Sequence, residues 1–212
     1  MRQHFFSLFG HKAQAGILQG DVMAGLPFPA QVMNQVHGVR IAEVTRYCEP
    51  TEADALITRN RGVRLMVRTA DCIPLVMADE EIGVAAAIHA GWRGLTADIV
   101  PLVLERLSEM GSSAQRLKVG VGPSLCVECA VFSNPEAEIP EKYHWATRRS
   151  RESLERPDLV DLNAILRRQL EEGGVRGENV EWLGPCTSCD PSWFSWRRDK
   201  DARRFGTWVV LV

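Results

Sequence analysis

A chain of 212 residues with 45% hydrophobic and 25% charged residues can bury a substantial core and has the composition of an ordinary globular protein. Its formal net charge of −2 excludes the strongly basic class that binds nucleic acid or acidic membranes through an overall field. No stretch reaches the roughly 18 apolar residues of a membrane span, and Met1–Gly10 lacks the long apolar stretch expected of a secretory signal. We therefore expect a cytoplasmic protein with reduced thiols, monomeric or a small homo-oligomer.

The predicted elements become regular only after the first 35 residues, which are weakly patterned. Short β-rich runs follow, the last of them apolar throughout, as in a strand covered on both faces: Val39–Val44, Ala53–Thr58, Val63–Thr69, Ile73–Ala78 and Ile82–His89. Helical spacing then predicts a helix over Leu95–Met110, which Pro101 should kink or start later, because proline lacks an amide donor.

The second half of the chain predicts fewer elements. We expect a strand at Leu117–Val121, a surface excursion over 134–157, an amphipathic helix over Asp161–Glu172 and closing strands at Val180–Leu183 and Thr207–Val212. Strands outnumber helices without a regular βαβ alternation. The pattern therefore predicts one α+β domain over residues 1–212, with mixed sheets.

Three residues stand out as candidates for chemistry. His37 precedes a predicted strand, Cys72 lies at a strand-to-strand corner, and His89 ends the most apolar strand. Two imidazoles and a thiolate suit zinc and leave a fourth tetrahedral position vacant. The spacing is too long for a zinc finger, however, and a buried thiol or a structural histidine would explain each residue separately.

These residues lie in motifs that resemble the laccase-domain proteins, also called the YfiH-like or polyphenol-oxidoreductase family. The resemblance runs in order from about residue 31 to 204, and its most specific parts are Thr-Ala-Asp-Cys before Ile73 and His-Ala-Gly-Trp-Arg-Gly from His89. It implies a layered α/β/β/α fold and a zinc ion held by His37, Cys72 and His89.

Two departures from the family pattern concern the ends of the chain. The N-terminal segment, about residues 1–30, is expected to be shortened, and Phe5–Gly10 only faintly resembles the family's longer arginine- and glycine-containing stretch. The Thr-Gly-Arg near the family's C-terminus stands here as Ala202-Arg203-Arg204. If the missing parts help to bind substrate, activity is expected to be altered.

The resemblance implies phosphorolysis of adenosine or inosine to base and ribose 1-phosphate, with adenosine deamination and methylthioadenosine cleavage as related activities. The substrates would then be a nucleoside and phosphate, with no nucleic acid or membrane partner. Arginine is suited to bind phosphate through two parallel hydrogen bonds. Arg68, Arg93 and Arg197, each inside a matched motif, are therefore candidates to bind phosphate, although pairing with Asp71 or Asp199 would also explain them. Asp71, beside Cys72, is expected to act as proton shuttle or as partner of a ligand.

Three alternatives remain open from the sequence. A conventional multicopper laccase needs more histidines than the five present, although adventitious copper at the same three ligands could oxidise polyphenols weakly. A metal-free hydrolase could use Cys72 as nucleophile and His89 as base, for example in editing cell-wall precursors. A zinc-dependent binding module without catalysis is the third.

The remaining pattern is a pair of Cys-x-x-Cys motifs, Cys126–Cys129 and Cys186–Cys189. Such a pair is a cue for a structural zinc site. Both motifs, however, lie within family-matched stretches. We therefore expect reduced thiols, or a disulfide between the pairs under oxidation, ahead of a second metal.

Overall fold

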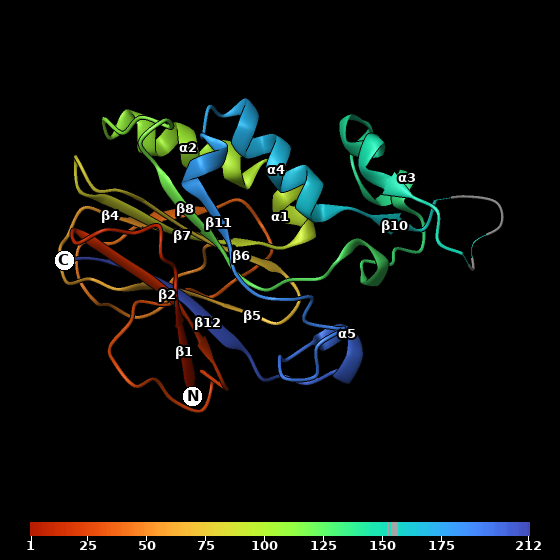
Figure 1. Ribbon diagram of the computed structural model, residues 1–212, viewed down its shortest axis with the longest axis horizontal. Helices are drawn as coiled ribbons and strands as arrows, with labels where there is room; N and C mark the ends of the chain where they lie inside the picture. The colour runs from red at the N-terminus through yellow and green to blue at the C-terminus, as the bar shows by residue number, and fades with distance from the viewer. Residues whose placement is uncertain (152, 154–156) are drawn as a thin grey trace.

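Two β-sheets lie face to face in the computed structural model, which describes residues 1–151, 153 and 157–212 (Figure 1). The larger sheet is mixed and has the order β11-β8-β6-β7-β4-β3, with strands Val180–Trp182, Lys118–Val121, Ile73–Asp79, Val84–Ala90, Ala55–Thr58 and Ile41–Glu43. The smaller sheet is antiparallel and has the order β1-β2-β12-β5, with strands Arg2–Phe5, Ala13–Gln19, Phe205–Leu211 and Leu65–Thr69.

Side-chain alternation along the central strands builds a core on each face of the larger sheet. In β7, Ala86 and Ile88 face the helices, whereas Ala85 and Ala87 face the smaller sheet. This explains why the predicted strand is apolar throughout, since both of its faces are covered. His89 has the parity of Ala85 and Ala87, so it lies at the rim of the space between the sheets.

The helical layer consists of α1 (Trp92–Thr96), α2 (Ile99–Glu109) and α4 (Leu162–Glu172), which pack on the larger sheet (Figure 1). The single helix predicted over Leu95–Met110 is divided at Asp98, whose φ of 67° is left-handed. Pro101 falls in the first turn of α2, where a missing amide donor costs little, so the shifted start is confirmed.

A smaller group of elements projects beside the sheets. It contains a 3₁₀ turn at Val127–Cys129, α3 (Pro135–Glu138), a 3₁₀ helix at Glu141–Ala146, β9 (Thr147–Arg148) and β10 (Leu159–Val160). The excursion expected over 134–157 lies here, except for residues 152 and 154–156, which are outside the described part. A 3₁₀ turn (Gly177–Asn179) precedes β11, and α5 (Trp196–Asp199) precedes β12.

The α+β class with mixed sheets is confirmed, and two features differ from expectation. The segment before residue 35, which has little periodicity, contributes β1 and β2, and β2 is an internal strand of the smaller sheet. Among the described residues, helices cover only one of the two outer faces of the paired sheets. On the other, Leu26, Phe28 and Val32 pack from a loop onto Trp208, where the layered α/β/β/α expectation placed helices.

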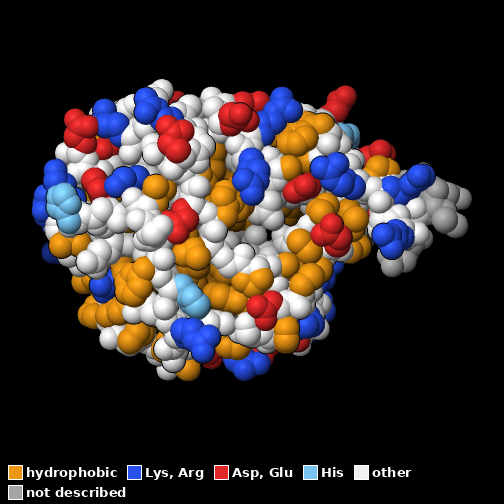
Figure 2. Space-filling model, in the orientation of Figure 1, with side chains coloured by type: hydrophobic (Ala, Val, Ile, Leu, Met, Phe, Trp, Pro, Cys, Tyr) orange, Lys and Arg blue, Asp and Glu red, His pale blue; other side chains and the backbone are white. Residues whose placement is uncertain are grey.

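The surface carries no large area of one charge on the face seen in Figure 2, where basic and acidic side chains alternate, in keeping with the small net charge. Among the described residues, every helix is too short or too polar to cross a lipid bilayer.

Candidate metal and anion site

The structure brings together His37, Cys72 and His89, which come from three separate segments. Their candidate ligand atoms all lie within 4.8 Å of one another. His89 is at the end of β7 and almost fully buried, Cys72 directly precedes β6, and His37 lies in the loop before β3. Antiparallel pairing of β6 with β7 places Cys72 beside the end of β7, so the sheet register itself produces this meeting.

Asp54 orients the side chain of His89. It is fully buried, and its carboxylate accepts a 2.8 Å hydrogen bond from Nδ1 of His89. The strand register explains the contact, because Ala55 of β4 pairs with Ile88 of β7. Because Nδ1 of His89 is hydrogen-bonded to Asp54, Nε2 is the ring nitrogen that remains to bind a metal ion. This arrangement is typical of metal-binding histidines.

The same carboxylate also shapes the loop that carries His37. The backbone amides of Val36, His37 and Gly38 donate to Asp54 at 3.3, 2.9 and 2.7 Å. His37 has a left-handed φ of 60°, which is unfavourable for a non-glycine residue by about 1–2 kcal/mol. Strained backbone of this kind concentrates at functional sites, and here the amide bonds hold it in place.

The ionisation of the group is strongly perturbed in the protein without metal. Burial opposes the thiolate of Cys72, but hydrogen bonds from His37 and His89 outweigh it and lower the pKa of the thiol to about 6. Burial likewise opposes the imidazolium of His89, yet the contacts with Asp54 and Cys72 raise the pKa of His89 to about 9. The two groups therefore form a thiolate–imidazolium pair around neutral pH.

Three observations test whether these residues fit a metal ion. A tetrahedral zinc, with bonds of about 2.3 Å to sulfur and about 2.0 Å to nitrogen, separates those atoms by about 3.5 Å. Sγ of Cys72 and Nε2 of His37 are 4.0 Å apart. Asp54 fixes the tautomer of His89, and Gly91 leaves room, since a Cβ there would lie 2.9 Å from Cδ2 of His37. The donor set therefore fits one zinc-sized ion.

A cavity of about 420 Å³ opens over the three candidate ligands. Its lining includes the aromatic side chains Trp92, Phe132 and Trp196, which offer flat apolar surfaces. Four arginines also line it, namely Arg68, Arg93, Arg197 and Arg204. The cavity therefore combines metal ligands, aromatic rings and positive charge.

The positive charges of these four arginines are not neutralised by ion pairs within the described part of the chain. Among the described residues, none of the four forms an ion pair with a carboxylate, so the pairing expected with Asp71 or Asp199 does not occur. The guanidinium of Arg197 donates to the carbonyl of Val131, and that of Arg93 stacks 4.2 Å from the ring of Trp92. Unpaired cations around a cavity are suited to bind an anion.

The pKa of Arg68 is affected by its place in the cavity lining. Its guanidinium donates to the carbonyl of Met33 at 3.0 Å. Burial, and then the charge of Arg204, lower the pKa of Arg68. Arg204 stands in the Ala-Arg-Arg stretch that replaces the family's Thr-Gly-Arg, and it lies on the cavity, so the basic side chain of that motif is retained.

Asp71 has a different partner from the one expected. Its carboxylate accepts hydrogen bonds from Oγ1 of Thr187 at 2.8 Å and from the amide of Arg197 at 2.6 Å. It thus fastens the loop before β12 to the cavity, whereas the carboxylate that holds a ligand histidine is Asp54. A proton-shuttle role for Asp71 stays a prediction.

Asp54 and the lining residues Trp92 and Phe132 were not predicted as parts of the site. The signal for Asp54 was present as an acid within the apolar run Ala53–Ile57, since a fully buried carboxylate needs a specific partner. Asp161 caps α4 by accepting a hydrogen bond from the amide of Ala164. Asn163 bonds the carbonyl of Leu125.

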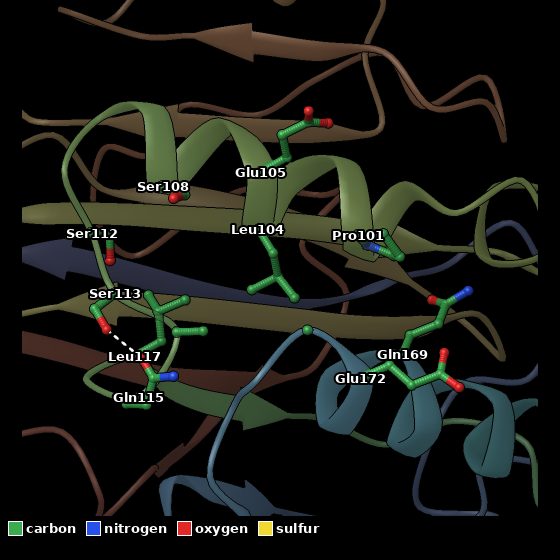
Figure 3. A pocket seen from close by; sticks show the side chains of 12 residues that line it. Pro101, Leu104, Glu105, Ser108, Ser112, Ser113, Gln115, Leu117, Gln169 and Glu172 are labelled. Atoms are coloured by element: carbon green, nitrogen blue, oxygen red, sulfur yellow. Dashed lines mark hydrogen bonds between the residues drawn. The ribbon is translucent and has the colours of Figure 1, made fainter.

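A larger groove of about 600 Å³ lies between α2 and α4 (Figure 3). Its lining contains serines, apolar residues and the carboxylates Glu105 and Glu172, without histidine, cysteine or a basic side chain. This groove offers neither a histidine or cysteine to bind zinc nor a cation to bind an anion. The smaller cavity is therefore the better candidate for a functional site.

Known proteins of several kinds are similar to this chain. A family model described as multicopper polyphenol oxidoreductase laccase matches residues 19–212. A purine nucleoside phosphorylase of Streptomyces coelicolor is 36% identical over 86% of this chain and 76% of its own length. Adenosine deaminase RL5, from an unknown prokaryotic organism, is 34% identical over 68% of this chain and 56% of its own.

Solved structures agree on the fold. YlmD from Geobacillus stearothermophilus superposes with a TM-score of 0.79 at 22% identity, covering 97% of this chain and 94% of that one. YfiH from Bacillus licheniformis gives 0.78 at 21% identity, covering 94% and 93%. With the matched family model extending over most of its length, this chain belongs to the polyphenol oxidoreductase laccase family, of YfiH-like fold.

Proposed function

We propose that this protein is a zinc-dependent purine nucleoside phosphorylase, which converts adenosine or inosine and phosphate to a free base and ribose 1-phosphate. The observation that carries the proposal is one cavity in which a three-ligand metal group faces four arginines without carboxylate partners among the described residues. The names of the relatives support the same activity.

Phosphorolysis places two demands on a site. A phosphate oxygen forms a bond to C1′ of the ribose while the bond from C1′ to the purine nitrogen breaks, so the anion and the base must be held on opposite sides of the sugar. Arginines bind phosphate in bidentate fashion, and Arg68 with Arg204 provides two adjacent cations. Trp92, Phe132 and Trp196 supply surfaces on which a purine can stack.

His37, Cys72 and His89 would hold the zinc ion, with Asp54 fixing His89. Bound zinc acts as a Lewis acid and lowers the pKa of water, chemistry that also suits deamination of adenosine. The named deaminase among the relatives supports this as a further activity. Copper at the same ligands could support weak polyphenol oxidation, because a soft donor set binds both ions.

The test is a phosphate-dependent turnover screen on adenosine, inosine and methylthioadenosine with the zinc-loaded protein. Cys72→Ala should abolish turnover, whereas Cys48→Ala, at an exposed thiol remote from the cavity lining, should keep it. Omitting phosphate should stop release of ribose 1-phosphate and leave only deamination. Folded, zinc-loaded wild type that consumes no nucleoside would remove the proposed activity.

A second candidate rests on the closeness of Cys72 to the two histidines. In the metal-free protein this thiolate–imidazolium pair resembles the nucleophile and base of a cysteine hydrolase acting on amides. Protein purified without metal, in which Cys72 is alkylated much faster than Cys48 at neutral pH and an amide substrate acylates it, would favour the hydrolase. Stoichiometric zinc that protects Cys72 from alkylation would favour the phosphorylase.

A further inference from the structure

The four cysteines of the two Cys-x-x-Cys motifs meet in space outside the cavity. Cys126 directly precedes the 3₁₀ turn after β8 and Cys129 is its last residue, and Cys186 and Cys189 lie in the loop after β11. Their four sulfur atoms all lie within 4.8 Å of one another, although the two motifs are about 60 residues apart.

The sulfur separations match a metal site better than a disulfide. Sγ of Cys189 lies 3.9 Å from that of Cys126 and 3.5 Å from that of Cys129. Four thiolates at about 2.3 Å from a tetrahedral zinc are about 3.8 Å apart. A disulfide would bring one pair to about 2.05 Å and leave the other two thiols without a role.

Both loops hold their sulfurs by local hydrogen bonds. The amides of Cys129 and Ala130 donate to the carbonyl of Cys126, and the amide of Asp190 donates to that of Cys186. The amide of Cys126 also points at Sγ of Cys186, at 3.3 Å, which favours a thiolate there. Arg198 supports the second loop by donating to the carbonyls of Thr187, Ser188 and Asp190.

We infer that Cys126, Cys129, Cys186 and Cys189 bind a second, structural zinc ion, separate from the ligands of the proposed active site. The spacing of the motifs is a cue for zinc, and their place in family-matched stretches led us to expect reduced thiols; the convergence of all four sulfurs favours a closed four-thiolate site. Each thiol releases its proton to solvent as it becomes a ligand.

Such an ion would join two loops that both donate a hydrogen bond to Asp71, a residue of the cavity lining. The first loop contains Leu125, which lines the cavity and donates its amide to the carbonyl of Asp71. The second contains Thr187, which donates to the carboxylate of Asp71. A metal between these loops would thus hold Asp71 from both sides and keep Arg197 over the cavity.

The experiment uses the full chain and two metals, zinc and cobalt(II). Zinc content by mass spectrometry should be two ions per chain in wild type. It should fall by one in Cys189→Ser and by one in Cys72→Ser, and stay unchanged in Cys48→Ser, which removes an exposed cysteine outside both groups.

Cobalt keeps the test decisive if Cys189→Ser folds poorly. Cobalt(II) added to the demetallated Cys72→Ser protein should give the intense thiolate charge-transfer absorption of a four-sulfur tetrahedral site. Two results would overturn the inference: only weak absorption without sulfur-to-cobalt bands, or a disulfide between the motifs in protein purified under reducing conditions. Because Cys72 is absent here, loss of nucleoside turnover bears on the proposed function and leaves this result untouched.

Discussion

Replacing Asp54 by asparagine tests how far one buried carboxylate governs the candidate metal group. The carboxylate accepts four hydrogen bonds, from Val36, His37, Gly38 and His89. Asparagine has one acceptor oxygen. If that oxygen keeps Val36 and Gly38, its NH₂ group faces the amide of His37 and Nδ1 of His89.

This exchange should affect both folding and metal binding. A buried amide left unsatisfied costs about 1–3 kcal/mol, and the lost charge-assisted bonds add to this, so we expect a loss of about 3 kcal/mol in unfolding free energy. Nδ1 of His89 would become an acceptor, which moves its proton to Nε2, the nitrogen needed for metal. Loss of such an orienting partner typically lowers metal affinity about 10–100-fold.

Chelator competition measures the zinc affinity, in a Cys189→Ser background so that one proposed site reports, and urea unfolding measures stability. Asp79→Asn is the matched control. Asp79 is also fully buried and bonds Ser112 and Arg116, at the end of β6 away from Cys72. It should lower stability and leave zinc affinity unchanged. Asp54→Asn protein that binds zinc as tightly as wild type would refute the orienting role.

Three further predictions concern space, charge and pH. Gly91→Ala, whose Cβ would meet the side chains of all three candidate ligands, should weaken zinc binding at least tenfold, whereas Gly177→Ala meets nothing within 4 Å and should bind as wild type; equal affinities would contradict the packing argument. Arg204→Gln removes one cation from the cavity and should raise the KM for phosphate about 10–100-fold with little change for the nucleoside, as about 1.5–3 kcal/mol per charged hydrogen bond implies; an unchanged phosphate KM would place the anion elsewhere. For Asp79, burial acts to raise the pKa, but bonds from Arg116 and Ser112 outweigh it and lower it below 3.8. Its contribution to stability is present above that value and is lost as the pH falls further, so urea midpoints of Asp79→Asn should decline less than those of wild type between about pH 4 and pH 2; parallel curves would exclude this linkage.

The predicted elements match best where periodicity is strong. The strand ending at His89 and the helix capped by Asp161 were both foreseeable, because burial on two faces and a capped amphipathic pattern leave clear signals. β2 was not foreseen, since its partner β12 is close to 190 residues away and no local pattern specifies that pairing. The break at Asp98 likewise depends on packing against α4.

Only part of the candidate site could be predicted from the sequence. His37, Cys72 and His89 were predicted, because each lies beside or at the end of a predicted strand and within a stretch that resembles the laccase-domain family. The structure brings these three residues together. Asp54 was missed, because it directly precedes β4 and its role depends on its contact with His89 of the neighbouring strand β7. Arg204 was noted only in a stretch that departs from the family pattern, and its place in the cavity lining depends on the fold. The opposite happened with the cysteine pairs, whose regular spacing was discounted until three-dimensional proximity gave it weight.

The position of β12 has a consequence for how the cavity comes into being. This strand inserts between β2 and β5, and it directly follows Arg204, while β5 carries Arg68. On the ribosome, β2 and β5 emerge long before the strand that joins them, and long-range closures of this kind are slow. The arginines of the cavity can therefore come together only after β12 has been made, so chains truncated before β12 should not bind phosphate.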